Sequence, residues 1–173
     1  YLVYGFRDDS FKYKIGGGFR VNPKSKTWVN ISYIDDLKET GSSDFLTDSR
    51  SFSFFEPRLL NIDLFHKHIT SAISLEHEIN PKLYSKSEIA ISNIRPTYSY
   101  NYLLDGNNYS GFETTTAKVA LQWNPFNTSQ TSDNGNQTII EGYPKFTLQY
   151  TKSFKDVLNA DFNFSKLDFK TIH

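Results

Sequence analysis

Residues 11–21 read FKYKIGGGFRV, and the alternation in this stretch decides the fold class. Its odd-numbered positions are apolar or glycine, from Phe11 to Val21, whereas its even-numbered positions carry Lys12, Lys14 and Arg20 beside two glycines. Successive side chains of a β-strand point to opposite faces of a sheet. The stretch therefore predicts a strand with one apolar face and one cationic face.

The same two-residue period recurs through the rest of the chain. A polar turn at residues 22–26 is followed by alternation over 27–34, which is typical of a β-hairpin. Proline marks a strand end or a bulge, so Arg95 and Pro96 interrupt the pattern before the aromatic run of Tyr98, Tyr100 and Tyr102. The other alternating segments are 69–79, the residues around Ile89 and Ile91, 116–123, 146–151 and 158–165. The chain is thus predicted to be all-β and antiparallel.

Irregular polar stretches separate these segments. Two long ones, 35–61 and 125–145, and a shorter one, 105–111, are predicted to be loops. Bacterial outer-membrane barrels usually keep their long loops on one side of the membrane, which requires an even number of strands between them. Either residues 59–65 form one additional strand, which we favour, or one of the long loops faces the periplasm.

The composition excludes several functional classes. The 173 residues include 15 Phe, 11 Tyr and 2 Trp but no Cys, so thiolate metal sites, thiol catalysis and disulfides are excluded. Lys and Arg together number 19, as do Asp and Glu, so no net charge attracts nucleic acid. No run approaches the ~20 apolar residues of a transmembrane helix, so any membrane contact must use strands.

The length of the alternating segments favours a membrane barrel over a soluble sandwich. Several alternate over ~9 to 11 residues, as a tilted strand needs to cross a bilayer. We therefore predict an antiparallel transmembrane β-barrel segment over residues 1–173, with two long loops, as part of a larger barrel. The side chains expected to face lipid are Tyr13, Phe19, Leu121, Trp123, Phe146, Leu148 and Phe162, and those expected to face the lumen are Lys14, Arg20, Lys118 and Gln149.

Three stretches carry a resemblance to a known family. They are YGFRDD at 4–9 with FKY at 11–13, EHEINPKL at 76–83 and YPKFTLQYTK at 143–152. They resemble a Bacteroidota outer-membrane family of unknown function, whose members carry a carboxypeptidase-regulatory-like domain ahead of a predicted barrel. The resemblance implies a bacterial outer-membrane location, contact with lipid and membership of a larger envelope complex. It implies no catalytic residue and no cofactor.

A search for catalytic and metal-binding patterns yields one weak candidate. His66 and His68 share a strand face with Glu76 and Glu78, but ten residues of strand span ~33 Å, too far for one metal ion. No nucleophile elbow or phosphate-binding loop is present.

The leading prediction is therefore a non-enzymatic outer-membrane barrel protein that serves as a structural, transport or assembly component of the envelope. One alternative is a soluble β-sandwich that binds carbohydrate or protein. The other alternative is an outer-membrane hydrolase built around His66, His68 and nearby carboxylates.

Overall fold

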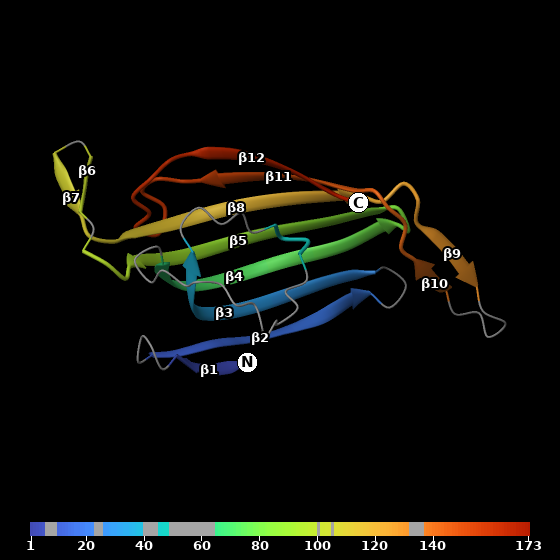
Figure 1. Ribbon diagram of the computed structural model, residues 1–173, viewed down its shortest axis with the longest axis horizontal. Helices are drawn as coiled ribbons and strands as arrows, with labels where there is room; N and C mark the ends of the chain where they lie inside the picture. The colour runs from blue at the N-terminus through green and yellow to red at the C-terminus, as the bar shows by residue number, and fades with distance from the viewer. Residues whose placement is uncertain are drawn as a thin grey trace.

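The computed structural model describes residues 1–5, 10–22, 26–39, 45–48, 65–99, 101–104, 106–131 and 137–173, and these are almost entirely strands and turns (Figure 1). None of these residues belongs to a helix long and apolar enough to cross a membrane. The all-β, antiparallel prediction is confirmed.

Eight strands form one antiparallel sheet, in the order β1-β2-β3-β4-β5-β8-β11-β12. Strands of this sheet that follow one another along the chain also lie side by side, so the topology is a simple meander. The sheet is not closed into a barrel, because β1 and β12 form its two edges. The strands are β1 (Leu2–Gly5), β2 (Ser10–Asn22), β3 (Thr27–Glu39), β4 (Phe65–Asn80), β5 (Leu83–Pro96), β8 (Phe112–Trp123), β11 (Lys145–Ser153) and β12 (Ser165–Ile172).

Two small hairpins interrupt the meander at opposite ends of the sheet (Figure 1). β6 (Tyr102–Leu104) pairs with β7 (Asn107–Tyr109) between β5 and β8, and β9 (Thr128–Thr131) pairs with β10 (Gln137–Ile140) between β8 and β11. The predictions of plain loops at 105–111 and 125–145 are therefore wrong. Both regions are polar and lack a long alternating pattern, which is why the short strands were missed.

The connection between β3 and β4 also differs from the prediction. β3 continues through Glu39, where a loop was expected from Asp35 onwards, because Asp36 pairs with His68 and Lys38 with His66. β3 then pairs directly with β4, so three strands of the sheet separate the two long connections. These connections leave opposite ends of the sheet, contrary to our expectation. Residues 59–64, where the additional strand was expected, lie outside the described part of the chain.

Residues 154–164 form a compact turn instead of the predicted strand over 158–165. Asp156, Leu158 and Asn159 have φ values of 62°, 51° and 64°, which no extended strand can accommodate. The Asp156 amide donates to the Ala160 carbonyl at 2.9 Å, and the Ser153 amide donates to the Phe164 carbonyl at 2.9 Å. β12 therefore begins at Ser165. The aromatic run after Pro96 is likewise no strand over its described residues 97–99.

The described residues bury very little apolar surface. The buried hydrophobic side chains among them are three alanines, Ala90, Ala120 and Ala160. A soluble domain instead buries large aliphatic and aromatic side chains in a packed core. The sheet therefore has no hydrophobic core of its own within the described residues.

Two glycines provide a matched test of the backbone packing. A Cβ at Gly142 would lie 2.2 Å from the carbonyl oxygen of Phe126, whereas a Cβ at Gly17 would meet nothing within 4 Å. We predict that Gly142→Ala lowers the free energy of unfolding by about 1–3 kcal/mol, as overpacking does. Gly17→Ala should change it by less than about 1 kcal/mol. Urea titration of the purified protein measures both, and equal effects would contradict the assigned packing.

Candidate functional site

One face of the eight-stranded sheet collects nearly all of its exposed large apolar side chains. Ile31 lies opposite Ile73, and Ile73 lies opposite Ile89, so apolar residues of neighbouring strands fall in the same row. Of the large hydrophobic residues that the structure describes as exposed on these strands, Trp28 and Ile172 alone lie on the other face. The exposed large apolar residues of this apolar face are Leu2, Tyr4, Phe11, Ile15, Phe19, Val21, Ile31, Tyr33, Ile73, Leu75, Ile79, Ile89, Ile91, Val119, Leu121, Trp123, Leu148, Tyr150, Leu167 and Phe169.

Aromatic stacks lie near both ends of the apolar face. Tyr13 and Tyr33 stack at 5.9 Å between ring centroids, and Asp35 on β3 lies directly opposite Tyr13. At the other end, the Trp123 and Phe146 rings stack at 5.6 Å. The Phe146 ring in turn stacks on Phe169 at 6.4 Å. The aliphatic part of the face therefore lies between two groups of aromatic rings.

The apolar band crosses the strands obliquely. On β3 and β5 it includes Tyr33 and Ile91, but the residue opposite Ile91 on β8 is Thr115. On β8 and β11 the band is displaced towards Trp123 and Phe146, at the opposite end of those strands. Strands in a barrel wall are tilted by about 35–45° to the barrel axis, so a level apolar belt crosses them at an angle.

The opposite, polar face of the sheet is held by pairs between neighbouring strands. Ion pairs join Glu76 to Lys86 at 2.6 Å and Glu88 to Lys118 at 3.0 Å. Along β11 the polar side chains are buried, and they are Lys145, Thr147, Gln149, Thr151 and Ser153. Among the described residues, no buried side-chain nitrogen or oxygen lacks a hydrogen-bond partner. The polar face is therefore satisfied internally.

Residues 45–48, from the connection between β3 and β4, dock on this polar face. The Leu46 amide donates to Oε1 of Gln149 at 2.8 Å. Lys170 Nζ lies 2.8 and 2.9 Å from the two carboxylate oxygens of Asp48 and 5.4 Å from the centre of the Phe45 ring. A segment of the chain thus covers part of the polar face, whereas the apolar face remains exposed.

Nearly all of the residues predicted to line the two sides of a barrel wall fall on two opposite faces. Alternation along β2, β8 and β11 gives the apolar face Tyr13, Phe19, Leu121, Trp123, Phe146 and Leu148, and the polar face Lys14, Arg20, Lys118 and Gln149. Phe162 is the exception, because it lies in the turn before β12.

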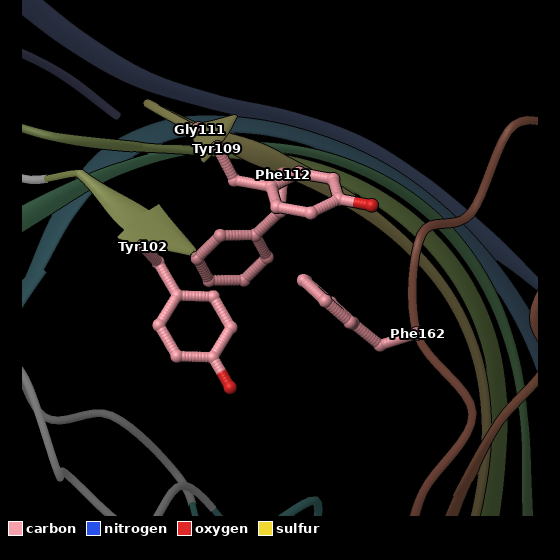
Figure 2. A pocket seen from close by; sticks show the side chains of 5 residues that line it. All are labelled: Tyr102, Tyr109, Gly111, Phe112 and Phe162. Carbon is pink, nitrogen blue, oxygen red and sulfur yellow. The ribbon is translucent and has the colours of Figure 1, made fainter. Parts of the chain in front are cut away.

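Phe162 instead belongs to an aromatic pocket at one end of the sheet. Its ring lies 5.5 Å from those of Tyr109 and Phe112 and 6.5 Å from that of Tyr102. These rings and Gly111 line a cavity of about 260 Å³. Figure 2 shows these rings on the inner side of the curved sheet. Phe112 belongs to the polar face of β8, so the polar face is the concave face of the sheet. The sequence analysis missed this pocket, because the β6–β7 hairpin that brings the rings together has no clear signal.

The candidate metal ligands do not meet. His66 stacks on Tyr98 at 5.8 Å and lies 6.4 Å from His68, measured between ring centroids. Glu76 and Glu78 lie towards the other end of β4, and Glu76 pairs with Lys86. The described residues contain no group of three His, Asp or Glu side chains that could hold a metal ion. The hydrolase alternative thus gains no support from these histidines.

The whole chain, residues 1–173, matches the C-terminal domain of a family of unknown function, DUF5686. The chain belongs to this family. No curated protein and no solved structure matches it. The predicted membership of a family of unknown function is thereby confirmed.

The docking of residues 45–48 generates a prediction for the DUF5686 domain. Lys170→Gln removes the ion pair with Asp48, and a partly exposed pair of this kind contributes up to about 1 kcal/mol. Hydrogen exchange at the Leu46 amide should therefore accelerate about fivefold.

Lys166→Gln is the matched control, because Lys166 pairs with Asp168 on the same strand instead of with the docked segment. An unchanged rate at Leu46 in Lys170→Gln, or the same acceleration in the control, would contradict the assigned role of the pair.

Proposed function

We propose that the DUF5686 domain forms part of the wall of a bacterial outer-membrane β-barrel, with its apolar face against lipid and its polar face towards the lumen. This proposal rests on which side chains are exposed, because the apolar and polar faces are exposed and covered in the reverse of the way expected for a soluble protein. The apolar face is exposed across the sheet, whereas the polar face is ion-paired and partly covered by residues 45–48.

The free energy of solvation supports this placement. Complete burial of one large apolar side chain contributes about 1.5–3 kcal/mol. Covering the exposed half of the twenty side chains of the apolar face is therefore worth roughly 15–30 kcal/mol. Folded domains have a net stability of only about 5–15 kcal/mol. An apolar face left in water would forgo more stabilisation than such a domain possesses, so we infer that it is covered, and lipid is the cover that fits a broad convex surface.

Strand lengths agree with a membrane span. β2 and β3 each contain 13 residues and β5 contains 14. At ~3.3 Å per residue, such strands are about 43 Å long, and a tilt of about 45° reduces their height to about 30 Å. That is the thickness of the hydrocarbon core. The stacked aromatic rings near both ends of the apolar face would lie at the two interfaces, where Trp and Tyr are enriched.

The two edges of the sheet require pairing in this environment. Unpaired backbone N–H and C=O groups cost several kcal/mol each in hydrocarbon, so only closed barrels span membranes with strands. Neighbouring strands in the eight-stranded sheet are antiparallel, so β1 and β12 run in opposite directions. They can therefore close a barrel by pairing directly, or with an even number of further strands between them. Either arrangement gives the even strand number of bacterial outer-membrane barrels.

The biochemical role we propose is that of a non-enzymatic structural, transport or assembly component of the envelope. The described residues offer ion-paired polar side chains along the concave side, and the partner that we propose for the apolar face is lipid. An outer-membrane location rests on the family resemblance together with the exposed apolar face.

Neighbouring residues on β8 test the assignment of the faces. Leu121 belongs to the apolar face and Gln122 to the polar face of the same strand. Leu121→Arg should lower the free energy of unfolding in bilayers by about 2–4 kcal/mol, because it places a charge against hydrocarbon. Gln122→Arg should cost less than about 1 kcal/mol, since a hydrated lumen accepts the charge. Denaturant titration in lipid vesicles measures both, and equal costs would count against the proposal.

Cell fractionation tests the location itself. The full-length protein should sediment with outer membranes, remain there after washing with high salt, and migrate faster on a detergent gel when it has not been heated. Recovery in the soluble fraction, with one mobility before and after heating, would favour the soluble β-sandwich instead.

A further inference from the structure

Trp28 lies on the face of the sheet where a large apolar side chain is least expected. It belongs to β3, and 43% of its surface is exposed. The residues opposite it are Arg20 on β2 and Glu76 on β4, and Glu76 in turn lies opposite Lys86 on β5. An exposed indole ring among charged side chains on a concave polar face is a feature of binding sites for small molecules, which combine an aromatic surface with a few fixed polar groups.

A cavity of about 370 Å³ adjoins this ring. That volume falls within the range of about 300–1,000 Å³ typical of small-molecule sites. The residues that line it come from β2 to β5 and the turn before β3, and they are Arg20, Lys26, Trp28, Glu76, Glu78 and Tyr84.

Contacts between neighbouring strands hold the polar groups of this pocket in place. Lys26 pairs with Glu78 at 2.5 Å, and Glu76 pairs with Lys86 at 2.6 Å. Tyr84 on β5 lies opposite Glu78 on β4 and lines the same pocket. Hydrogen-bonding groups held in this way are oriented before a ligand arrives, which reduces the entropic cost of binding.

The charges that line the pocket decide which ligands fit. Arg20 and Lys26 contribute two positive charges, and Glu76 and Glu78 contribute two negative charges, so the lining has no net charge. A phosphate or a polycation would meet as much repulsion as attraction. A neutral molecule with many hydroxyl groups can accept hydrogen bonds from the guanidinium and ammonium groups and donate to the carboxylates.

We propose that this pocket binds a neutral saccharide. The apolar C–H face of a sugar ring would lie against the Trp28 indole, and its hydroxyl groups would meet Arg20, Lys26, Glu76 and Glu78. The aromatic pocket around Phe162 is less suited to this ligand, because no charged side chain lines it. The Trp28 site does not depend on the proposed membrane location, since it lies on the polar face, and its test does not depend on lipid.

The test uses the full-length protein in detergent and an array of immobilised glycans. The array contains neutral hexose and N-acetylhexosamine oligosaccharides beside sialylated and sulfated ones, and calorimetry with the tightest neutral glycan gives the dissociation constant. We expect binding to neutral glycans. Trp28→Leu, which keeps apolar volume but removes the aromatic face, should weaken binding about tenfold or more.

Two variants serve as controls. Trp28→Phe keeps an aromatic face and should stay within about threefold of the original affinity, so it separates loss of stacking from loss of folding. Trp123→Phe changes the tryptophan of the apolar face and should leave the dissociation constant unchanged. Three results would each overturn the proposal: no neutral glycan bound, binding of acidic glycans alone, or equal affinity in Trp28→Leu and the original protein.

Discussion

The hydrogen-bond register between neighbouring strands is the constraint on which the other features depend. Ile31 on β3 lies opposite Gly17 on β2 and Ile73 on β4. Because the side-chain period of a strand is two residues, a slip of one position would move every side chain of a strand to the other face. The two bulges of the sheet lie beside the short turns, between Arg20 and Asn22 and between Glu78 and Asn80, so the central rows remain uninterrupted.

This register gives the sheet a polar face and an apolar face, which need different surroundings. The polar face satisfies itself through ion pairs such as Glu88 with Lys118 and through the docking of Asp48 on Lys170. The large hydrophobic side chains of the apolar face remain exposed, and the buried hydrophobic side chains among the described residues are alanines. A hydrocarbon environment meets its requirement without any further packing layer, whereas water does not. The membrane proposal and the saccharide proposal therefore concern different faces of one sheet.

Much of the fold was predictable from the sequence, because alternation reports strands directly. It located the central parts of β2, β3, β4, β8 and β11 and assigned their residues to opposite faces. It failed at 158–165, where alternating residues adopt left-handed φ angles, and at the two small hairpins, which are too short for periodicity to register. The Trp28 pocket was missed because it depends on which residues of β2, β4 and β5 come to lie beside Trp28, and a single strand does not reveal that.

The most direct test of the central claim is the environment of alternate residues on β8. The chain has no cysteine, so single cysteines can be introduced at Val119, Leu121, Lys118 and Gln122 and spin-labelled in reconstituted full-length protein. The account predicts that labels at Val119 and Leu121 collide mainly with oxygen, which concentrates in lipid, and that labels at Lys118 and Gln122 collide mainly with a water-soluble nickel chelate. Preferential collision of the Val119 and Leu121 labels with the nickel chelate would contradict it.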